Sequence, residues 1–95
     1  MKFEFTRHAI LRMSERGIGV DEVERAVRDG KIIARYPDDR PYPSCLTAAI
    51  TDGIPIHVLS SIAETDEEKV FYIITVYRPD PAEWNSDYSE RRTPR

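Results

Sequence analysis

KVFYIITVY, residues 69–77, is the stretch that decides the fold. It is mostly apolar and rich in β-branched and aromatic side chains, which is typical of a strand buried on both faces. Pro79 and Pro81 follow it, and they end the strand because proline cannot donate the next hydrogen bond of a sheet. We therefore predict a central strand here, with the other elements arranged around it.

Three segments before this strand also have strand character: KIIARY (31–36), CLTAAIT (45–51) and PIHVLSSI (55–62). Asp52-Gly53 gives a hairpin turn between the second and the third of them. The segment PDDRPYPS, residues 37–44, holds three prolines and is predicted to be a loop. KFEF at residues 2–5 alternates as well and is consistent with a further short strand.

The segment from Thr6 to Gly17 has helical spacing. Thr6 has the side-chain oxygen of an N-cap, and Gly17 is a good C-terminal stop. Ala9, Ile10 and Met13 fall within one arc of the helix, so we expect all three to face the core.

A second helix is predicted to follow at once. Asp21 and Glu24 have the spacing of a capping box, and Gly30 ends the segment. Val23 and Ala26 belong to its apolar side. The link between the two helices is only a few residues long, so we expect the helices to pack as a hairpin.

These elements predict an α+β fold with two N-terminal helices packed on one face of a curled antiparallel sheet of three to four strands. We expect one domain over residues 1–84, with Trp84 anchoring the chain. Residues 85–95 have no apolar pattern, and we expect a flexible C-terminal tail there.

Composition narrows the class of protein. No apolar run approaches the ~20 residues needed to span a bilayer, and the N-terminus lacks the apolar core of a signal peptide. The single cysteine, Cys45, fits a reducing compartment, so we expect a cytoplasmic protein without membrane association. A net charge of −3 counts against a simple nucleic-acid binder. Four of the acids lie within residues 64–68, however, so a basic face elsewhere is compatible with the sequence.

The most informative side chains are two histidines among arginines. His8 lies in the first turn of the first helix, where backbone N–H groups favour anions. Arg12 and Arg16 follow on the same side, and a guanidinium binds phosphate through two parallel hydrogen bonds. The alternative is a surface helix whose arginines form i,i+4 ion pairs.

His57 lies in the middle of a strand and faces the opposite side from Ile56 and Val58. It is either a structural histidine with satisfied ring nitrogens or a group that meets a substrate. Tyr77 and Arg78 end the last strand and lead into a proline-bounded loop.

Arg40 lies on the loop of residues 37–44, beside Tyr36 and Tyr42. Tyrosine rings at such positions stack on bases or cover the edge of a sheet. No phosphate-binding glycine loop and no zinc-ligand motif is found in the sequence, so we expect neither a cofactor nor a metal.

The motifs TRHAILRMSERGI (6–18), YPDDRPYPSCL (36–46), DGIPIHVL (52–59) and ITVYRPDP (74–81) together resemble a family of small prokaryotic proteins known as a domain of unknown function. The resemblance extends over about residues 4–84. That family looks related to the RelE- and MqsR-like ribonuclease toxins, which share a helix–helix–sheet layout and cut messenger RNA without metal. Its members are often encoded beside a short zinc-finger protein that looks like an antitoxin.

The resemblance carries over His8, Arg12, Arg16, Arg40, His57 and Tyr77. The resulting hypothesis is a catalytic set of His8, His57, Arg12, Arg40 and Tyr77, with Arg16, Tyr36, Tyr42 and Arg78 binding substrate. This chain departs from such toxins in being acidic, since they are commonly basic.

Two functions are therefore expected candidates. The first is the toxin of a toxin–antitoxin pair, a metal-independent endoribonuclease in which the RNA 2′-hydroxyl attacks the phosphate, one histidine being the base and the other the acid. The second is a non-catalytic protein-interaction module of the same fold, which binds its partner through a sheet edge and the tail.

Overall fold

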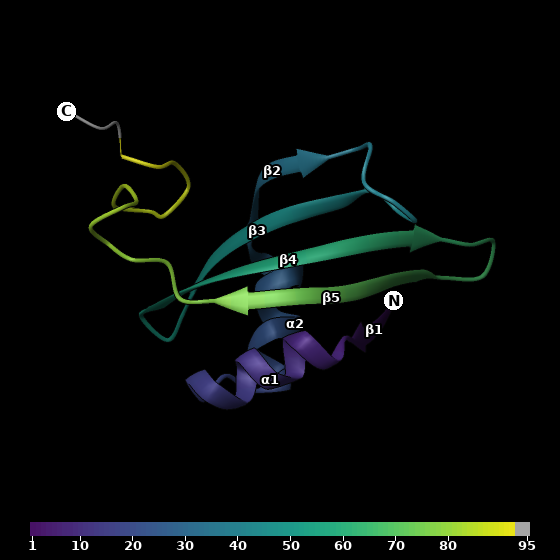
Figure 1. The fold of residues 1–95 in the computed structure, drawn as a ribbon, viewed down its shortest axis with the longest axis horizontal. Helices are drawn as coiled ribbons and strands as arrows, with labels where there is room; N and C mark the ends of the chain where they lie inside the picture. The colour runs from purple at the N-terminus through teal and green to yellow at the C-terminus, as the bar shows by residue number, and fades with distance from the viewer. Residues whose placement is uncertain (93–95) are drawn as a thin grey trace.

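Five strands and two helices make up residues 1–92, the part of the chain that this computed structural model describes. In chain order they are β1 (Lys2–Phe5), α1 (Arg7–Arg16), α2 (Val20–Asp29), β2 (Lys31–Tyr36), β3 (Ser44–Thr51), β4 (Ile54–Glu64) and β5 (Lys69–Tyr77). The strand order in the sheet is β1-β5-β4-β3-β2, and both helices lie on the same side of it (Figure 1). The α+β class and the two N-terminal helices are confirmed.

The sheet has five strands and is mixed, so the prediction of three to four antiparallel strands is wrong. β2 to β5 form the antiparallel meander, but β1 pairs with β5 in parallel. Phe3 lies opposite Phe71, and their rings stack with centroids 5.4 Å apart. A strand of four residues gives only a weak signal in the sequence. Here β1 is a strand because its backbone pairs with the side of β5 that β4 leaves open. That pairing makes β5 an interior strand, as its composition predicts.

Thr6 joins α1 to the sheet. Its hydroxyl accepts a hydrogen bond from the Ala9 N–H at 3.1 Å and lies 3.0 Å from the Ile73 carbonyl, to which it donates. Ala9 and Met13 are buried, but Ile10 is 54% exposed, which overturns its assignment to the core. α1 packs against β5, near one edge of the sheet. Its buried stripe is therefore narrower than that of a helix packed over the middle of a sheet.

α2 lies across β3 and β4. Its N-cap is Gly19, with no side-chain hydrogen bond, so the capping box predicted at Asp21 and Glu24 is wrong. The helix begins before Asp21, which leaves that carboxylate in the first turn, where the helix dipole favours it. At its end, a Cβ on Gly30 would lie 2.4 Å from the Ala26 carbonyl oxygen, so only glycine allows this close approach.

The hydrophobic core fills the space between the helices and the sheet. Its buried members are Ala9, Met13, Ile18, Val23, Ala26, Ile56, Val58, Phe71, Ile73 and Val76. Strand alternation in β4 sends Ile56 and Val58 into this core and His57 to the opposite face, as predicted.

After β5 the chain turns back beside the end of the sheet (Figure 1). Trp84 is buried, and its backbone pairs with that of Arg91. The Asn85 side-chain oxygen accepts the N–H groups of Ser89 and Glu90 at 3.0 and 3.2 Å. Residues 85–92, assigned to a flexible tail from the sequence, thus make specific contacts, and residues 93–95 lie outside the described part. Within the part that is described, neither helix has the length and apolarity needed to cross a membrane.

Candidate functional site on the open face of the sheet

The face of the sheet opposite the helices, which we call the open face, carries the candidate site. Strand register places His57 opposite Tyr77, and Leu59 opposite both Thr75 and Leu46. A register shift between Leu59 and Ser60 interrupts the pairing of β4 with β5, which then continues to Glu64. The open face therefore has an apolar floor with polar groups along the end of β5.

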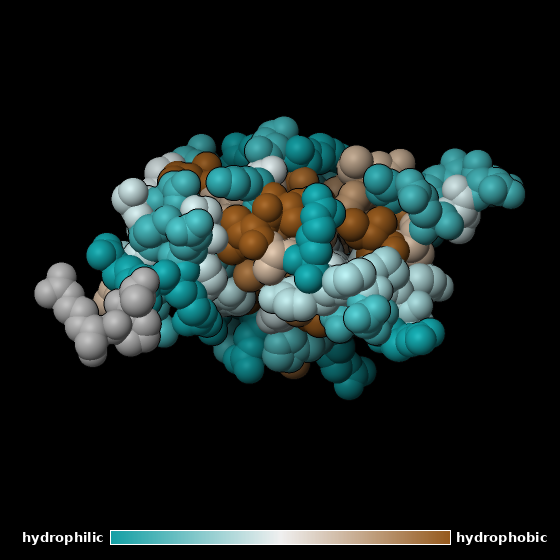
Figure 2. Space-filling view, turned by 90° about the horizontal axis from the view of Figure 1, so that it is seen from above, coloured by the Kyte–Doolittle hydropathy of each residue, from teal (hydrophilic) through white to brown (hydrophobic). Residues whose placement is uncertain are grey.

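Two adjoining grooves lie on this face. The Tyr77 groove has a volume of about 260 Å³ and is lined by Tyr36, Asp39, Leu46, Leu59, Thr75 and Tyr77. The Arg40 groove, of about 460 Å³, is lined by Thr6, Arg40, Pro41, Tyr42, Ser61, Tyr72 and Ile74. Seen from above the view of Figure 1, apolar side chains gather in the middle of the surface, interrupted by a hydrophilic side chain and bordered by others (Figure 2).

His8 lies at the rim of the Tyr77 groove. Its Nε2 is 3.1 Å from the Thr75 hydroxyl, and Thr75 lines the groove. The imidazole is exposed and sits in the first turn of α1, which continues directly from the Thr6 cap beside β5. The helix thus brings a histidine from the other side of the sheet to the edge of the open face.

His57 is fully buried, and hydrogen bonds fix its tautomer. Nε2 lies 2.8 Å from the Tyr88 carbonyl oxygen, which only accepts, so Nε2 carries the proton. Nδ1 of the neutral ring then accepts from the Tyr77 hydroxyl at 3.0 Å. The Trp84 ring covers the imidazole edge-on, with centroids 4.5 Å apart. His57 therefore reaches the groove through Tyr77 and not directly.

Burial sets the protonation of this pair. It lowers the pKa of His57; the hydrogen bond to Tyr88 acts in the opposite direction, and the nearby positive charge of Arg91 lowers the pKa further. Burial also raises the pKa of Tyr77. Both shifts favour uncharged groups, which agrees with a phenol donating to a neutral imidazole.

The Arg40 groove combines a cation with aromatic rings. Tyr42 stacks on Tyr72 with centroids 5.8 Å apart and planes only 2° from parallel. Arg40 is exposed beside this pair, and Tyr36 is exposed on the neighbouring groove. Such an arrangement can hold a planar ring against an aromatic face and a negative group against the guanidinium.

Asp39 brings a carboxylate to the Tyr77 groove, where it accepts a hydrogen bond from Ser44. The carboxylate of Asp39 therefore adds a hydrogen-bond acceptor beside the apolar floor of the groove. Within residues 1–92, no three histidine, cysteine or acidic side chains come together closely enough to hold a metal ion.

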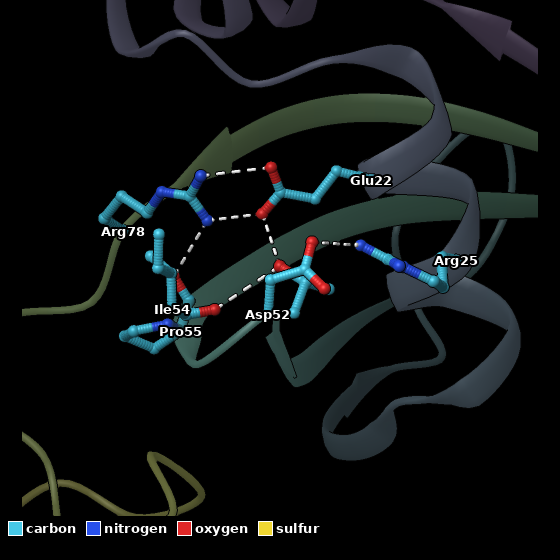
Figure 3. Close-up of polar contacts among 7 residues, drawn as sticks. Glu22, Arg25, Asp52, Ile54, Pro55 and Arg78 are labelled. Carbon is cyan, nitrogen blue, oxygen red and sulfur yellow. Dashed lines mark hydrogen bonds and ion pairs between the residues drawn. The ribbon is translucent and has the colours of Figure 1, made fainter.

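The other arginines lie outside the two grooves. Arg12 pairs with Glu15 at 3.0 Å on the exposed surface of α1, and Arg16 is exposed in the last turn of that helix. Arg78 binds both carboxylate oxygens of Glu22, at 2.6 and 3.1 Å, and donates to the Pro55 carbonyl at 3.1 Å (Figure 3).

The Arg78–Glu22 pair joins α2 to the end of β5. The side chains are only 26% and 19% exposed, and the ion pair lowers the pKa of Glu22. Thr51 donates a further hydrogen bond to the same carboxylate. In the structure Arg78 thus holds the fold together, at the side of the sheet that faces the helices.

Besides Asp39, four residues that shape the site were not among the sequence-predicted ones: Tyr72, Thr75, Trp84 and Tyr88. The first two belong to β5, where an irregular register with β4 hides which residues face outward. Tyr88 contributes a backbone carbonyl, for which no side-chain pattern gives a signal. The tryptophan was expected to anchor the chain, but its contact with His57 needed the structure.

The structure thus defines a small α+β domain whose two helices cover one face of a mixed sheet, with grooves on the other. The chain belongs to the family described as a domain of unknown function, DUF4258, whose sequence profile matches residues 5–78. No curated protein and no solved structure matches the chain. The match ends at Arg78, so the C-terminal segment that covers His57 lies beyond it.

Proposed function

We propose that this protein is a metal-independent endoribonuclease, the toxin of a toxin–antitoxin pair, that binds single-stranded RNA across the open face. The observation that carries the proposal is the placement of His8, Tyr77 and Arg40 around two adjoining grooves. Asp39 and Arg40, which are consecutive residues, each line one of them. Proton-transferring groups therefore lie beside a cation and stacked aromatic rings.

The proposed reaction uses the 2′-hydroxyl of the RNA. Its oxygen bonds to the adjacent phosphorus, and the bond from phosphorus to the 5′-oxygen breaks. One group takes the 2′ proton and another protonates the leaving oxygen, giving a 2′,3′-cyclic phosphate and a 5′-hydroxyl. We assign these proton transfers to His8 and Tyr77, with His57 behind Tyr77. General acid–base catalysis of this kind contributes roughly 10²–10⁴-fold in rate.

RNA binding is assigned to the tyrosines and to Arg40. Stacking of a base on an aromatic ring is worth about 1–3 kcal/mol, and it tolerates different bases. Arg40 would contact phosphate. Arg12 and Arg78 are left out of the proposed contacts, because each guanidinium already pairs with a carboxylate.

The proposal includes a relationship to RelE- and MqsR-like toxins and a small zinc-finger antitoxin as partner, both of which rest on the sequence resemblance. A cytoplasmic location is part of the same proposal. The arrangement of two helices on one face of the sheet, with grooves on the opposite face, supports the proposed relationship to these toxins.

The test is cleavage of single-stranded RNA by the purified full chain in the presence of EDTA, with the product ends identified. We expect cyclic phosphate and 5′-hydroxyl ends, and a rate lowered at least ~100-fold in both His8→Gln and Tyr77→Phe. Arg12→Gln, on the exposed surface of the same helix, is the matched control and should retain the rate. Folded wild-type protein that leaves RNA intact, or variants that cut as fast as wild type, would refute the proposal.

A non-catalytic protein-interaction module is the second candidate. Among the residues that the structure describes, β2 pairs with β3 alone and forms one edge of the sheet, and Ile32 on it is 39% exposed. An edge strand with an exposed apolar side chain suits strand addition by a partner, and the net charge of −3 favours a protein over RNA. This function would be favoured if the folded chain left RNA intact and lost its partner when charge was placed at Ile32.

A further inference from the structure

The C-terminal segment, residues 79–92, makes its most specific contact with the sheet at His57. The Tyr88 carbonyl lies 2.8 Å from Nε2, while the Trp84 ring covers the side of the imidazole. Both contacts come from outside the part of the chain that matches the DUF4258 family. A segment beyond the family region thus takes part in the geometry of a fully buried histidine inside that region.

The backbone at Tyr88 is held in an uncommon conformation. Its φ is 62°, in the left-handed region that side-chain-bearing residues seldom adopt. The surrounding loop enforces it: the Tyr88 N–H donates to the Asn85 carbonyl at 3.0 Å, and the Asn85 side chain accepts two further N–H groups. This conformation directs the Tyr88 carbonyl at His57. Backbone strain of this kind persists where the surroundings over-determine it, and it often accompanies a functional site.

A second set of contacts holds the segment itself together. The Arg92 guanidinium donates to the Trp84 carbonyl at 2.8 Å, and that of Arg91 lies over the Trp84 ring, 4.9 Å from its centroid. The His57 imidazole is fully buried, and each ring nitrogen is bonded to one defined partner.

We infer that residues 79–92 are a positioning element of the site: the Tyr88 carbonyl holds His57 as the Nε2–H tautomer, and His57 in turn holds the Tyr77 hydroxyl at the groove. Without the carbonyl, the neutral ring is free to carry its proton on Nδ1 instead. An Nδ1–H cannot accept from Tyr77, so the phenol loses its fixed direction. His57 and Tyr88 thus act through Tyr77, the group that lines the groove.

This inference rests on the proposed function only for its effect on activity, because the tautomer is measured directly. The probe is ¹⁵N NMR of the full chain, which has two histidines, so exposed His8 serves as an internal reference. We compare Tyr88→Pro with Tyr88→Gly. Both remove the phenol of residue 88, but proline forces φ near −65° and removes the N–H, whereas glycine accepts a φ of 62°. Thermal unfolding verifies that both variants fold.

We expect wild type and Tyr88→Gly to show His57 as a single Nε2–H tautomer whose pKa lies below the ordinary value for histidine. In Tyr88→Pro the Nδ1–H form should become populated, and RNA cleavage should fall roughly 10–100-fold, the usual cost of losing a group that orients another. His57→Asn, which keeps an acceptor near Tyr77, should retain more activity than His57→Leu.

An unchanged His57 tautomer in folded Tyr88→Pro would overturn the inference, and so would a changed tautomer with an unaltered cleavage rate. If wild-type protein cuts no RNA while the tautomer still responds only to Tyr88→Pro, the proposed function fails, but the assignment of the carbonyl as the group that positions His57 stands. The two failures are therefore distinguishable.

Discussion

The two faces of the sheet are built in different ways. The face toward the helices is covered by α1 and α2 and buries an apolar cluster that includes Ile56, Val58 and Ile73 without exposure. The open face is covered at one end by residues 79–92, and beside that cover it has two grooves bordered by the loop of residues 37–44. His57 lies between two core residues in sequence, yet it belongs to the second face.

The comparison shows that the apolar core and the candidate site lie on opposite faces of the same sheet. One domain of 95 residues has room for a single core, so the helix side carries most of the apolar burial. The open face keeps polar groups in reach of solvent, among them His8, Arg40 and Tyr77. Substitutions on the helix side should therefore mainly lower the stability of the fold, whereas substitutions on the open face should mainly change binding.

The largest expected effect comes from the helix side. Ile73→Ala should lower the free energy of unfolding by about 3–4 kcal/mol, because it leaves a cavity among fully buried side chains. Leu59→Ala, on the half-buried floor of the Tyr77 groove, should cost only about 1–2 kcal/mol. Urea unfolding of both variants measures the contrast, and equal losses would contradict the division into a packed face and an open face.

The ion pair between α2 and the end of β5 should come next. Arg78→Ala leaves the partly buried Glu22 carboxylate without its cation and should cost about 2–3 kcal/mol in urea unfolding. Arg25→Ala is the matched control, because Arg25 pairs with Asp52 on the exposed surface and should cost less than about 0.5 kcal/mol. A loss of RNA cleavage in Arg78→Ala without loss of stability would return this arginine to the substrate-binding set.

A smaller effect is expected from pH. Because burial lowers the pKa of His57 in the folded protein, the unfolded chain takes up the proton first as pH falls. This contribution to stability is complete above about pH 6.5 and is lost progressively below it. The groups around the imidazole are the Tyr77 hydroxyl, the Trp84 ring, the Tyr88 carbonyl and the Arg91 guanidinium.

Unfolding free energies at pH 7.5 and 5.5 provide the measurement. His57→Gln should flatten the fall in stability between these values, whereas His8→Gln, which changes an exposed imidazole, should leave it as in wild type. A wild-type stability that rises on going to pH 5.5 would contradict a neutral, buried His57.

The smallest expected effect on folding belongs to the open face. Tyr36→Ser removes a side chain that is 41% exposed and should change the free energy of unfolding by less than about 1 kcal/mol. If the ring stacks on a base, the affinity for single-stranded RNA falls by roughly 10-fold or more in a titration at fixed salt. The exposed Ile54→Ser serves as a control for a surface apolar residue outside both grooves.

Much of the fold could be predicted from local pattern. The strand over residues 69–77 follows from its continuous apolar and β-branched run, and Thr6 and Gly17 mark the ends of α1 as expected. β1 could not be counted with the same certainty, because its four residues become a strand through the edge of β5, 68 residues further along. Ile10 was wrongly assigned to the core. Helical spacing predicts which face of a helix is apolar, but it does not predict how much of that face the sheet covers.

The candidate site was predictable in its residue types and less so in its arrangement. Alternation places His57 on the face away from the core, and this is where it lies. The hydrogen-bond partners of His57 are the Tyr77 hydroxyl, which is placed by the strand register, and the Tyr88 backbone carbonyl. The spacing of side chains in the sequence predicts neither contact. The pairing of Arg78 with Glu22 joins residues 56 apart, so it too needed the tertiary structure.

The parallel pairing of β1 with β5 has a consequence for how the chain acquires its structure during synthesis. Proteins are made from the N-terminus at about 5–20 residues per second, and distant contacts wait until both segments exist. Within residues 1–92, β1 pairs in the sheet with β5 alone, and the hydrogen bond from Thr6 to Ile73 joins residues 67 apart. High contact order of this kind slows folding, because a long loop has to be closed before the contact is gained. The contacts of β1 and α1 with the sheet therefore cannot form until residues 69–77 have been synthesised.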